Sequence, residues 1–238
     1  MPDLRPTLLL TRPLAQSRRF AAEFAARYGA DWPVVISPLL EIVTVPAEVP
    51  PAPVVVFTSE SAVAPFAALS PAAGRRAWCV GPRTAKVAEA AGFVPILGPG
   101  EAQGLVRAIL AEETARPLLH ARGRHVAAEL AALLNAAGVQ TLEATVYDQI
   151  ELPPSIEEGR LLATDGPLLV PLFSPRSARL FAKRAANAQA RLWIAAISAA
   201  AAAPLVALTP ARLEVAPTPD AAGMMLALDR IVASADAG

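Results

Sequence analysis

The stretch V-V-V-F-T-S-E-S-A-V, Val54 to Val63, decides the fold class of this chain. Four apolar residues without polar alternation predict a strand that is buried on both faces, and the hydroxyl residues after them predict the start of a helix. A similar pattern, L-L-V-P-L-F-S-P-R-S-A, spans Leu168 to Ala178. Two buried strands that each lead through hydroxyl residues into a helix favour a parallel α/β architecture.

The same alternation of strands and helices extends along the chain. The apolar runs are Thr7 to Leu10, Val34 to Val45, Val54 to Phe57, Ala77 to Val80, Leu118 to Leu119, Thr141 to Tyr147, Leu168 to Phe173 and Leu192 to Ile197. The helix-like stretches that follow such runs include Ala15 to Tyr28, Thr84 to Ala91, His125 to Ala137 and Ser177 to Ala188. Strands that are apolar on both faces and separated by helices predict a parallel sheet covered on both sides.

An internal repeat divides these units into two sets. The motif L-L-L-T-R-P at Leu8 to Pro13 is similar to L-L-H-A-R-G at Leu118 to Gly123, and each is followed by a helix-like stretch and a further strand. A separation of roughly 110 positions is too long for a solenoid repeat and suits a duplicated domain. We therefore expect two doubly wound α/β domains.

The order of the repeated pieces predicts a discontinuous domain. If each domain needs about five strands, one lobe comprises residues 1–42 and 152–238, the other comprises residues 43–151, and a cleft lies between them. The two crossings, near Leu40 to Pro51 and Tyr147 to Pro154, are rich in proline and β-branched residues. Such segments suit an extended, two-stranded connector.

Composition narrows the class of partner. The 238 residues include 21 Lys plus Arg and 21 Asp plus Glu, so the formal net charge is zero. No broad electrostatic field then favours nucleic acid or an anionic membrane surface. The single cysteine, Cys79, lies in an apolar run, which predicts a small buried side chain and a reducing, cytoplasmic compartment.

No segment predicts export or a membrane span. The first apolar run has a charge on each side and is too short for a signal-peptide core. The window between Arg191 and Arg212 carries no charged residue, but it is mostly alanine and contains Pro204. A strand followed by an alanine-rich helix fits that window better than a membrane helix does.

Seven motifs, taken in order, resemble the uroporphyrinogen-III synthase family over most of the chain. They are L-L-L-T-R-P, I-S-P-L-L-E-I, V-F-T-S-E-S-A-V, V-G-P-R-T-A-K-V-A-E-A-A-G-F, L-L-H-A-R-G, A-T-V-Y-D-Q-I and L-F-S-P-R-S-A. The resemblance implies two flavodoxin-like lobes joined by a two-stranded connector, and a lyase of haem biosynthesis that needs no cofactor. It also implies a substrate, hydroxymethylbilane, in the cleft between the lobes, which loses water and closes with inversion of ring D through a spiro intermediate.

The hydroxyl residues after the buried strands then become candidate binding residues. In a doubly wound sheet, ligands bind beyond the carboxyl ends of the strands, where the first N–H groups of the next helix are unpaired. A rim of neutral donors suits a substrate rich in carboxylates. We expect such a rim from Thr58, Ser59 and Ser61 in one lobe and from Ser174 and Ser177 in the other.

A purely structural role is the alternative for these residues. Ser59 and Ser174 each precede a helix and can be N-caps that bind no ligand, although the two roles are compatible. Gly81 and Thr84 lie in V-G-P-R-T, which is a plain strand-to-helix turn with proline near the start of the helix. By resemblance, the same segment is the family's second binding turn.

Charged and aromatic residues complete the candidate site. Arg12 and Arg122, the latter followed by Gly123, occupy equivalent places in the repeat, where they pair with substrate carboxylates or are simply solvated. By resemblance, Tyr147 is the family's cleft tyrosine, and its phenol would assist departure of the substrate's hydroxyl group. Its alternative is a half-buried tyrosine that closes a strand end.

The two histidines predict no metal site. His120 and His125 lie close together in sequence without a second pair of ligands, so we expect a surface or turn role for both. No metal and no cofactor is expected.

The chain departs from the family pattern at two turns. Where the family's last binding turn usually reads I-G-P-T-T-A, Ile197 to Ala202 reads I-S-A-A-A-A, so Ser198 replaces the glycine and the threonine hydroxyls are missing. Glu60 stands where proline is usual. These departures keep a second hypothesis open, a two-lobed anion-binding module without turnover. We expect a monomer; a transient contact with the preceding pathway enzyme stays open.

Overall fold

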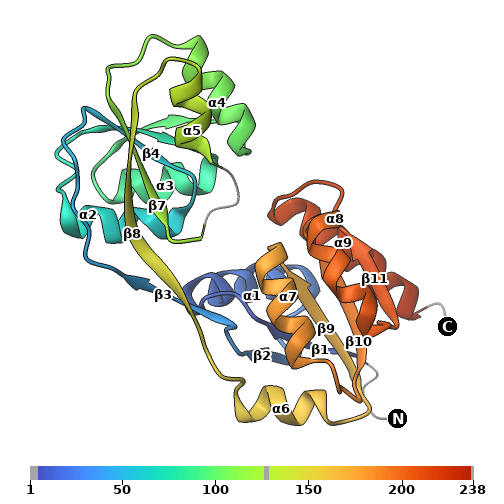
Figure 1. The fold of residues 1–238 in the computed structure, drawn as a ribbon. Helices are drawn as coiled ribbons and strands as arrows, with labels where there is room; N and C mark the ends of the chain where they lie inside the picture. Colours follow the sequence, from blue (N-terminus) through green and yellow to red (C-terminus); the bar gives the residue numbers. More distant parts are fainter. Residues whose placement is uncertain (1–4, 126–128, 237–238) are drawn as a thin grey trace. The chain divides into compact units, whose positions relative to one another are not determined.

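The computed structural model describes residues 5–125 and 129–236, and within them the chain folds into two compact units (Figure 1). Unit 1 comprises Met1–Glu41 and Glu151–Gly238, and unit 2 comprises Ile42–Ile150. Each unit is a sheet with helices between its strands. The α/β class with parallel sheets that the sequence predicts is confirmed.

Unit 1 contains a five-stranded sheet in the order β11-β10-β9-β1-β2, and every pairing in it is parallel. Its strands are β1 (Thr7–Leu10), β2 (Val34–Ile36), β9 (Pro167–Leu172), β10 (Arg191–Ala196) and β11 (Arg212–Val215). Its helices are α1 (Leu14–Tyr28), α6 (Ile156–Leu162), α7 (Pro175–Arg184), α8 (Ala199–Ala202) and α9 (Ala221–Asp236), with a 3₁₀ helix η2 (Ala203–Leu208) after α8.

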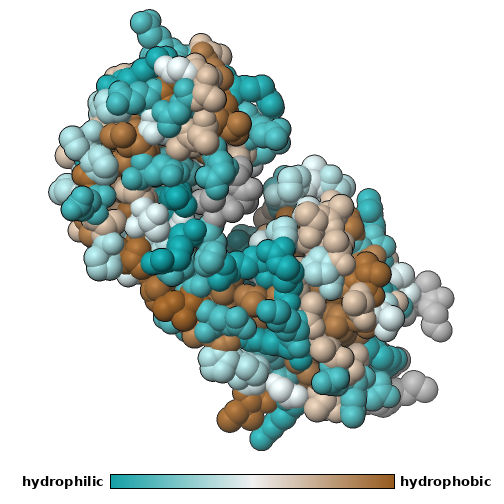
Figure 2. Space-filling model, viewed as in Figure 1, coloured by the Kyte–Doolittle hydropathy of each residue, from teal (hydrophilic) through white to brown (hydrophobic). Residues whose placement is uncertain are grey.

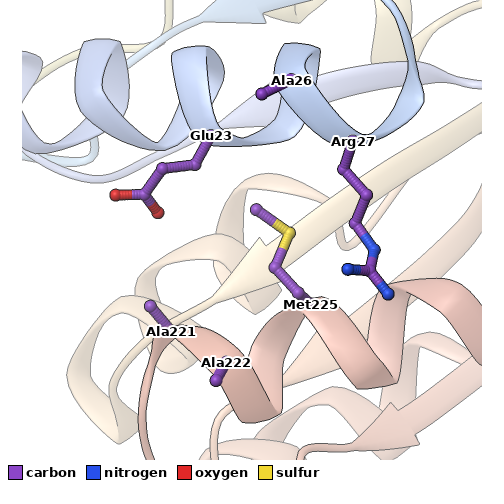
Figure 3. A pocket seen from close by; sticks show the side chains of 6 residues that line it. All are labelled: Glu23, Ala26, Arg27, Ala221, Ala222 and Met225. Carbon is purple, nitrogen blue, oxygen red and sulfur yellow. The ribbon is translucent and has the colours of Figure 1, made fainter.

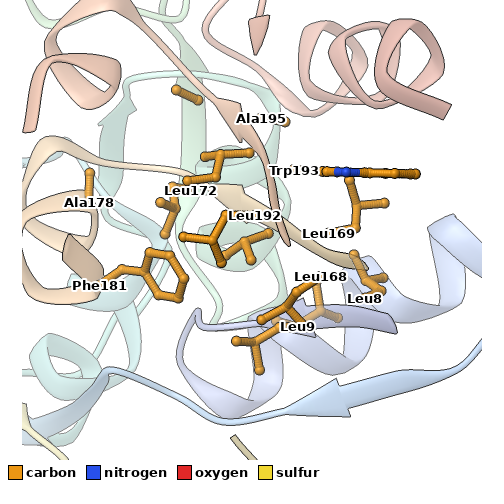
Figure 4. Close-up of a cluster of buried hydrophobic side chains, with 14 of the residues drawn as sticks. Leu8, Leu9, Leu168, Leu169, Leu172, Ala178, Phe181, Leu192, Trp193 and Ala195 are labelled. Atoms are coloured by element: carbon orange, nitrogen blue, oxygen red, sulfur yellow. The ribbon is translucent and has the colours of Figure 1, made fainter. Parts of the chain in front are cut away.

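Apolar strands hold the core of unit 1. Leu8, Leu9 and Leu10 of β1 are fully buried, as the unbroken apolar run predicts. Leucines of β9 and β10 pack beside them, and Phe181 of α7 closes one side of the cluster (Figure 4). Burial of each such side chain contributes roughly 1.5 to 3 kcal/mol, so this cluster is the main source of the stability of unit 1.

Unit 2 contains a six-stranded sheet in the order β3-β8-β7-β4-β5-β6. Its strands are β3 (Leu40–Thr44), β4 (Val54–Phe57), β5 (Arg76–Cys79), β6 (Val94–Leu97), β7 (Leu118–Gly123) and β8 (Thr141–Glu151). Its helices are the 3₁₀ helix η1 (Glu60–Ala62), α2 (Val63–Leu69), α3 (Pro82–Ala90), α4 (Ala102–Ala111) and α5 (Leu130–Ala136).

Strand β4 explains why unit 2 is covered on both faces. Val55 and Phe57 point into a cluster with Phe66 of α2, while Val54 and Val56 point into a second cluster with residues of α4 and α5. Successive residues of a strand face opposite sides of the sheet, so a strand that is apolar throughout needs helices on both sides. Cys79 of β5 is buried in the first cluster, as predicted.

The strand orders show how the two units are related. Counted along the chain, the strands of unit 1 follow the flavodoxin order 2-1-3-4-5, because β1 and β2 precede β9, β10 and β11. In unit 2 the same spatial arrangement results when β7 and β8 are counted first, followed by β4, β5 and β6. The second copy of the repeat is therefore a circular permutation of the first.

Strands β3 and β8 carry the chain across the boundary between the units. The backbone N–H of Val45 donates to the carbonyl of Val146 at 3.1 Å, and that of Leu152 donates to Leu39 at 3.0 Å. Residue numbers rise along one strand while they fall along the other, so the pair is antiparallel. Near the second of these contacts, the buried carboxylate of Glu158 accepts a hydrogen bond from Arg184 at 2.9 Å.

One local prediction differs from the structure and another is confirmed. The run Val34 to Val45, expected as one strand, is two strands, β2 and β3. The window after Arg191 forms β10 followed by α8 and η2, as the predicted strand and alanine-rich helix require. No helix among residues 5–125 and 129–236 is both long and apolar enough to cross a membrane. In the surface view, apolar residues are scattered among hydrophilic ones (Figure 2).

Candidate functional site

The two sheets each have one place where the strand order reverses, and the candidate residues gather there. In unit 1 this switch point lies between β1 and β9, which are followed by Arg12 and Ser174. In unit 2 it lies between β4 and β7. Thr58 follows β4, and Gly123 is the last residue of β7. Ligands of open α/β sheets bind outside the carboxyl ends of the strands at such a point. The topology thus supports the predicted location within each unit.

Three of the predicted serines are helix N-caps. Ser59 accepts a hydrogen bond from the N–H of Ser61 at 3.2 Å, and Ser174 accepts one from Ser177 at 3.0 Å. Ser198 caps α8 in the same way, with the N–H of Ala201 at 3.3 Å. The capping role that the sequence left open for Ser59 and Ser174 is therefore present, and Ser198 has it as well; each cap stabilises its helix by about 1 kcal/mol.

The remaining turn residues differ in exposure. Ser177 accepts a hydrogen bond from the Ser174 hydroxyl at 2.9 Å, which ties the two side chains together. Gly81 is the N-cap of α3 in an extended conformation and is followed by Pro82 at the first helical position. Thr84 is buried, so its hydroxyl faces the interior. Gly81 is buried as well, so Pro82 and Arg83 are the exposed residues of this turn.

Tyr147 lies next to the capping serine of unit 2. It is 5% exposed, and its hydroxyl is hydrogen-bonded to Ser59. Burial raises the pKa of Tyr147, and the bond to Ser59 opposes that rise. The phenol is therefore protonated at neutral pH, as a hydrogen-bond donor in catalysis must be.

Gly123 forms the surface against which the Tyr147 ring packs. A Cβ atom at position 123 would lie 2.5 Å from Cζ and 2.9 Å from the hydroxyl oxygen of Tyr147. The register of β7 and β8 shifts between Arg122 and Gly123, so that Gly123 faces Tyr147 instead of Val146. A β-bulge of this kind re-aims a side chain, and here it aims the phenol past the glycine. Position 123 requires glycine because of this contact.

His120 corrects the sequence prediction of a surface or turn role. It lies within β7, is 1% exposed, and its Nε2 is 3.1 Å from the Thr58 hydroxyl oxygen. Burial lowers the pKa of His120 to about 4, although the nearby Glu143 carboxylate favours the protonated ring. His125 is exposed, with its Nε2 3.6 Å from Asp148. The prediction was wrong for His120 because β7 continues past the apolar Leu118 and Leu119.

Arg122 borders a cavity in unit 2. The cavity has a volume of about 570 Å³ and is lined by Val45, Pro46, Arg122, Arg124 and Thr145. Both arginines have carboxylate partners: Arg122 Nε is 2.9 Å from Glu143, and Arg124 Nε is 2.8 Å from Asp148. Sequence reasoning missed Arg124, which follows the strand end directly and was identifiable from that position.

In unit 1, Arg12 stacks on an aromatic ring. Its guanidinium carbon lies 4.1 Å from the ring centroid of Phe173, and its carbonyl accepts a hydrogen bond from Ser17. Stacking holds the guanidinium plane at the carboxyl edge of β1 and β9.

Of the two departures from the family pattern, Glu60 forms an ion pair with Arg83 at 3.0 Å. The acidic residue on the rim is thus matched by a basic neighbour.

A second cavity lies away from these residues. It has a volume of about 390 Å³ and is lined by Glu23, Ala26 and Arg27 of α1 and by Ala221, Ala222 and Met225 at the start of α9 (Figure 3). None of the candidate residues lines it. In the described part of the chain, no group of three or more His, Cys, Asp or Glu side chains is placed to hold a metal ion.

Comparisons with known proteins identify the family. A model of the family "Uroporphyrinogen-III synthase HemD" matches residues 20–225, whereas no curated protein sequence matches significantly. Among solved structures, uroporphyrinogen-III synthetase from Helicobacter pylori is 18% identical, covers 95% of this chain and 99% of its own, and superposes with a TM-score of 0.65.

A mutant uroporphyrinogen III synthase from Thermus thermophilus shares 16% identity, with coverage of 96% of this chain and 99% of its own and a TM-score of 0.52. At these identities the two structures show a shared fold, and the family match carries the assignment. The chain belongs to the uroporphyrinogen-III synthase family, the cyclases of haem biosynthesis.

Proposed function

We propose that this chain is a lyase that closes hydroxymethylbilane to uroporphyrinogen III without a cofactor, and that Tyr147 is its catalytic residue. The observation that carries the proposal is the position of the phenol. The phenol is buried at the carboxyl edge of the unit 2 sheet, is protonated, and is hydrogen-bonded to Ser59. Its ring packs so closely on Gly123 that no side chain fits at that position. Membership of the family supplies the reaction.

The first barrier is the loss of a poor leaving group. The C–O bond of the terminal hydroxymethyl group breaks, and the hydroxyl oxygen keeps the electron pair and leaves, with a proton taken up, as water. The methylene carbon stays on the pyrrole ring, which becomes an azafulvene cation. A phenol that donates a hydrogen bond to the departing oxygen stabilises the negative charge that develops there. Because burial raises the pKa of Tyr147, the phenol acts as a hydrogen-bond donor at neutral pH.

The later steps depend on the conformation of the bound chain. The substituted carbon of ring D attacks the azafulvene, and the spiro intermediate then fragments and recloses with that ring inverted. Direct closure at the unsubstituted position would give the type I isomer. The protein needs to hold one folded conformation of the substrate in preference to another.

The two rims supply donors for the substrate's carboxylates. On unit 2 we assign this role to Ser59, Ser61, Gly81, Arg122 and Gly123, through side chains or backbone N–H groups. Thr84 is included only through its backbone, because its side chain is buried.

On unit 1 the corresponding residues are Arg12, Ser174, Ser177 and Ser198. A serine that caps a helix accepts a backbone N–H with one lone pair of its hydroxyl oxygen, so its own hydroxyl proton can still be donated. This proton is available at Ser198. The Ser174 hydroxyl donates to Ser177, so the Ser177 hydroxyl is the donor offered to a ligand there, and the Ser59 hydroxyl is engaged with Tyr147.

A direct assay tests the proposal. The protein is incubated with enzymatically generated hydroxymethylbilane, and the oxidised products are separated into isomers by chromatography. We expect the type III isomer in excess over a protein-free control. Formation of the type I isomer alone, at the rate of the control, would refute the proposed activity. If the product nevertheless binds in calorimetry, the chain is an anion-binding module without turnover. The alanine-rich turn after Ser198 would suit such a module.

A further inference from the structure

Three residues on adjacent strands of unit 2 form a connected polar group. Thr58 follows β4, His120 lies in β7, and Glu143 lies in β8. The Thr58 hydroxyl oxygen is 3.1 Å from His120 Nε2, and His120 Nδ1 is 3.5 Å from a carboxylate oxygen of Glu143. His120 is 1% exposed, whereas Thr58 is only partly buried. The hydroxyl therefore connects a buried imidazole to the solvent-accessible rim.

The two neighbours of His120 determine which ring nitrogen carries the proton. A neutral imidazole has one N–H and one acceptor nitrogen. The Glu143 carboxylate offers only acceptors, so a lone pair on Nδ1 would face negative charge, whereas an N–H on Nδ1 is attracted to it. The ring is neutral at physiological pH because burial lowers the pKa of His120 to about 4. Nδ1 then holds the proton, and Nε2 is an acceptor.

The state of His120 sets the direction of the hydrogen bond from Thr58. If Nε2 is an acceptor, the Thr58 hydroxyl must donate to it, because two acceptors do not bond. The hydroxyl proton of Thr58 is then committed inward, and the oxygen presents lone pairs to the rim. Ser59, one residue later, accepts from the N–H of Ser61 and is hydrogen-bonded to Tyr147, so its role differs from that of Thr58.

We propose that His120 is a positioning residue that fixes the Thr58 hydroxyl as a hydrogen-bond acceptor, so that Thr58 binds an N–H group of the ligand and not a carboxylate. This inference rests on the proposed function, in which the bilane chain carries pyrrole N–H groups. It reverses the donor role that the sequence predicts for Thr58. Within one rim, Thr58 would accept hydrogen bonds from pyrrole N–H groups, while its neighbours bind carboxylates.

The order hydroxyl, imidazole, carboxylate is also that of a hydrolase triad, but the energetics differ. A general base works best when its pKa lies near the working pH, and the pKa of His120 is about 4. Glu143 is also within 2.9 Å of Arg122, which further weakens its support of a protonated ring. The group orients a hydroxyl and does not generate a nucleophile.

The tautomer can be measured directly. With ¹⁵N-labelled histidine and a His125→Gln background, His120 is the single histidine in the spectrum, and the two ring nitrogens differ strongly in chemical shift. We expect Nδ1 protonated and Nε2 unprotonated at pH 7. A protonated Nε2 would overturn the inference, because the Thr58 hydroxyl would then be free to donate. His125→Gln is expected to retain parent activity.

Kinetics separate the acceptor role from a carboxylate-donor role. Thr58→Val keeps the shape and removes the hydroxyl, and we expect KM to rise about 2- to 10-fold with little change in kcat, as for one neutral hydrogen bond. Thr58→Ser retains the hydroxyl and should restore the parent KM. A rise above about 10-fold would indicate a bond to a charged group and would refute the acceptor role, as would no change in KM.

A second variant tests the link to His120. His120→Leu should raise KM by a similar factor, and Thr58→Val should add little to it, because both act on one hydrogen bond. Additive effects would remove His120 from this role. If the parent protein forms type III product but the KM values of these variants do not change as expected, only this inference fails. If the parent protein forms no type III product, the proposed function itself is refuted.

Discussion

Replacing Gly123 by alanine should impair catalysis by displacing the Tyr147 phenol. The new Cβ would lie 2.5 Å from Cζ, 2.7 Å from Cε2 and 2.9 Å from the hydroxyl oxygen of Tyr147. Carbon atoms in favourable contact are about 3.5 to 4.0 Å apart, so the ring must move by about 1 Å. A displacement of that size can cost about 100-fold in rate, while overpacking costs about 1 to 3 kcal/mol of stability.

The assay measures kcat for type III product together with the midpoint of denaturant unfolding. Gly159→Ala is the matched control, because a Cβ there meets nothing within 4 Å, and alanine is the better helix former. It should leave kcat unchanged and stability equal or higher.

The double variant Gly123→Ala with Tyr147→Phe shows whether Gly123 acts through the phenol. If it does, the double variant should be little slower than Tyr147→Phe alone. A Gly123→Ala protein that keeps kcat within twofold of the parent would refute the reasoning, since the ring would have moved without consequence.

Three further results are expected. Tyr147→Phe should lower kcat about 10- to 100-fold, the value of one hydrogen bond of about 1.5 to 3 kcal/mol, with type III still the main product by chromatography; a change within twofold would exclude Tyr147 from the mechanism. Because the pKa of His120 is about 4 when folded and 6.5 is its ordinary value, the unfolded state binds more protons between these pH values, so the unfolding free energy should fall as pH drops from about 6.5 to 4. His120→Leu should remove that part of the pH dependence in denaturant titrations, and an unchanged slope would contradict the assignment. Ser174→Ala should lower the unfolding free energy by about 1 kcal/mol through loss of the α7 cap, and an unaltered urea midpoint would show that the cap contributes nothing.

The sequence predicts buried strands well and edge strands poorly. β1, β4 and β9 are apolar on both faces, and their unbroken apolar runs predict them. β6 and β11 were missed because they lie at the ends of their sheets and carry little buried surface. Pro95 inside β6 also argues against a strand, although proline is tolerated at a sheet edge.

The contacts of the candidate site depend on register, which the sequence pattern does not contain. Thr58 and His120 meet because β4 pairs with β7, and these strands are separated along the chain by β5 and β6. Gly123 faces Tyr147 only because the register shifts at the end of β7. Residue types at strand ends predict where a site lies; pairing across strands decides which side chains act together.

The permuted repeat also indicates which unit carries the chemistry. When L-L-L-T-R-P is matched with L-L-H-A-R-G, the counterpart of His120 is Leu10; when I-S-P-L-L-E-I is matched with A-T-V-Y-D-Q-I, the counterpart of Tyr147 is Leu39. Both leucines are fully buried in the core of unit 1, so unit 1 has neither an imidazole nor a phenol at the equivalent positions. In unit 1 the counterpart of Thr58 is Ser174, whose hydroxyl oxygen accepts from the N–H of Ser177 in the following helix α7. We therefore propose that the reacting group belongs to unit 2 and that the residues at the switch point of unit 1 serve binding alone.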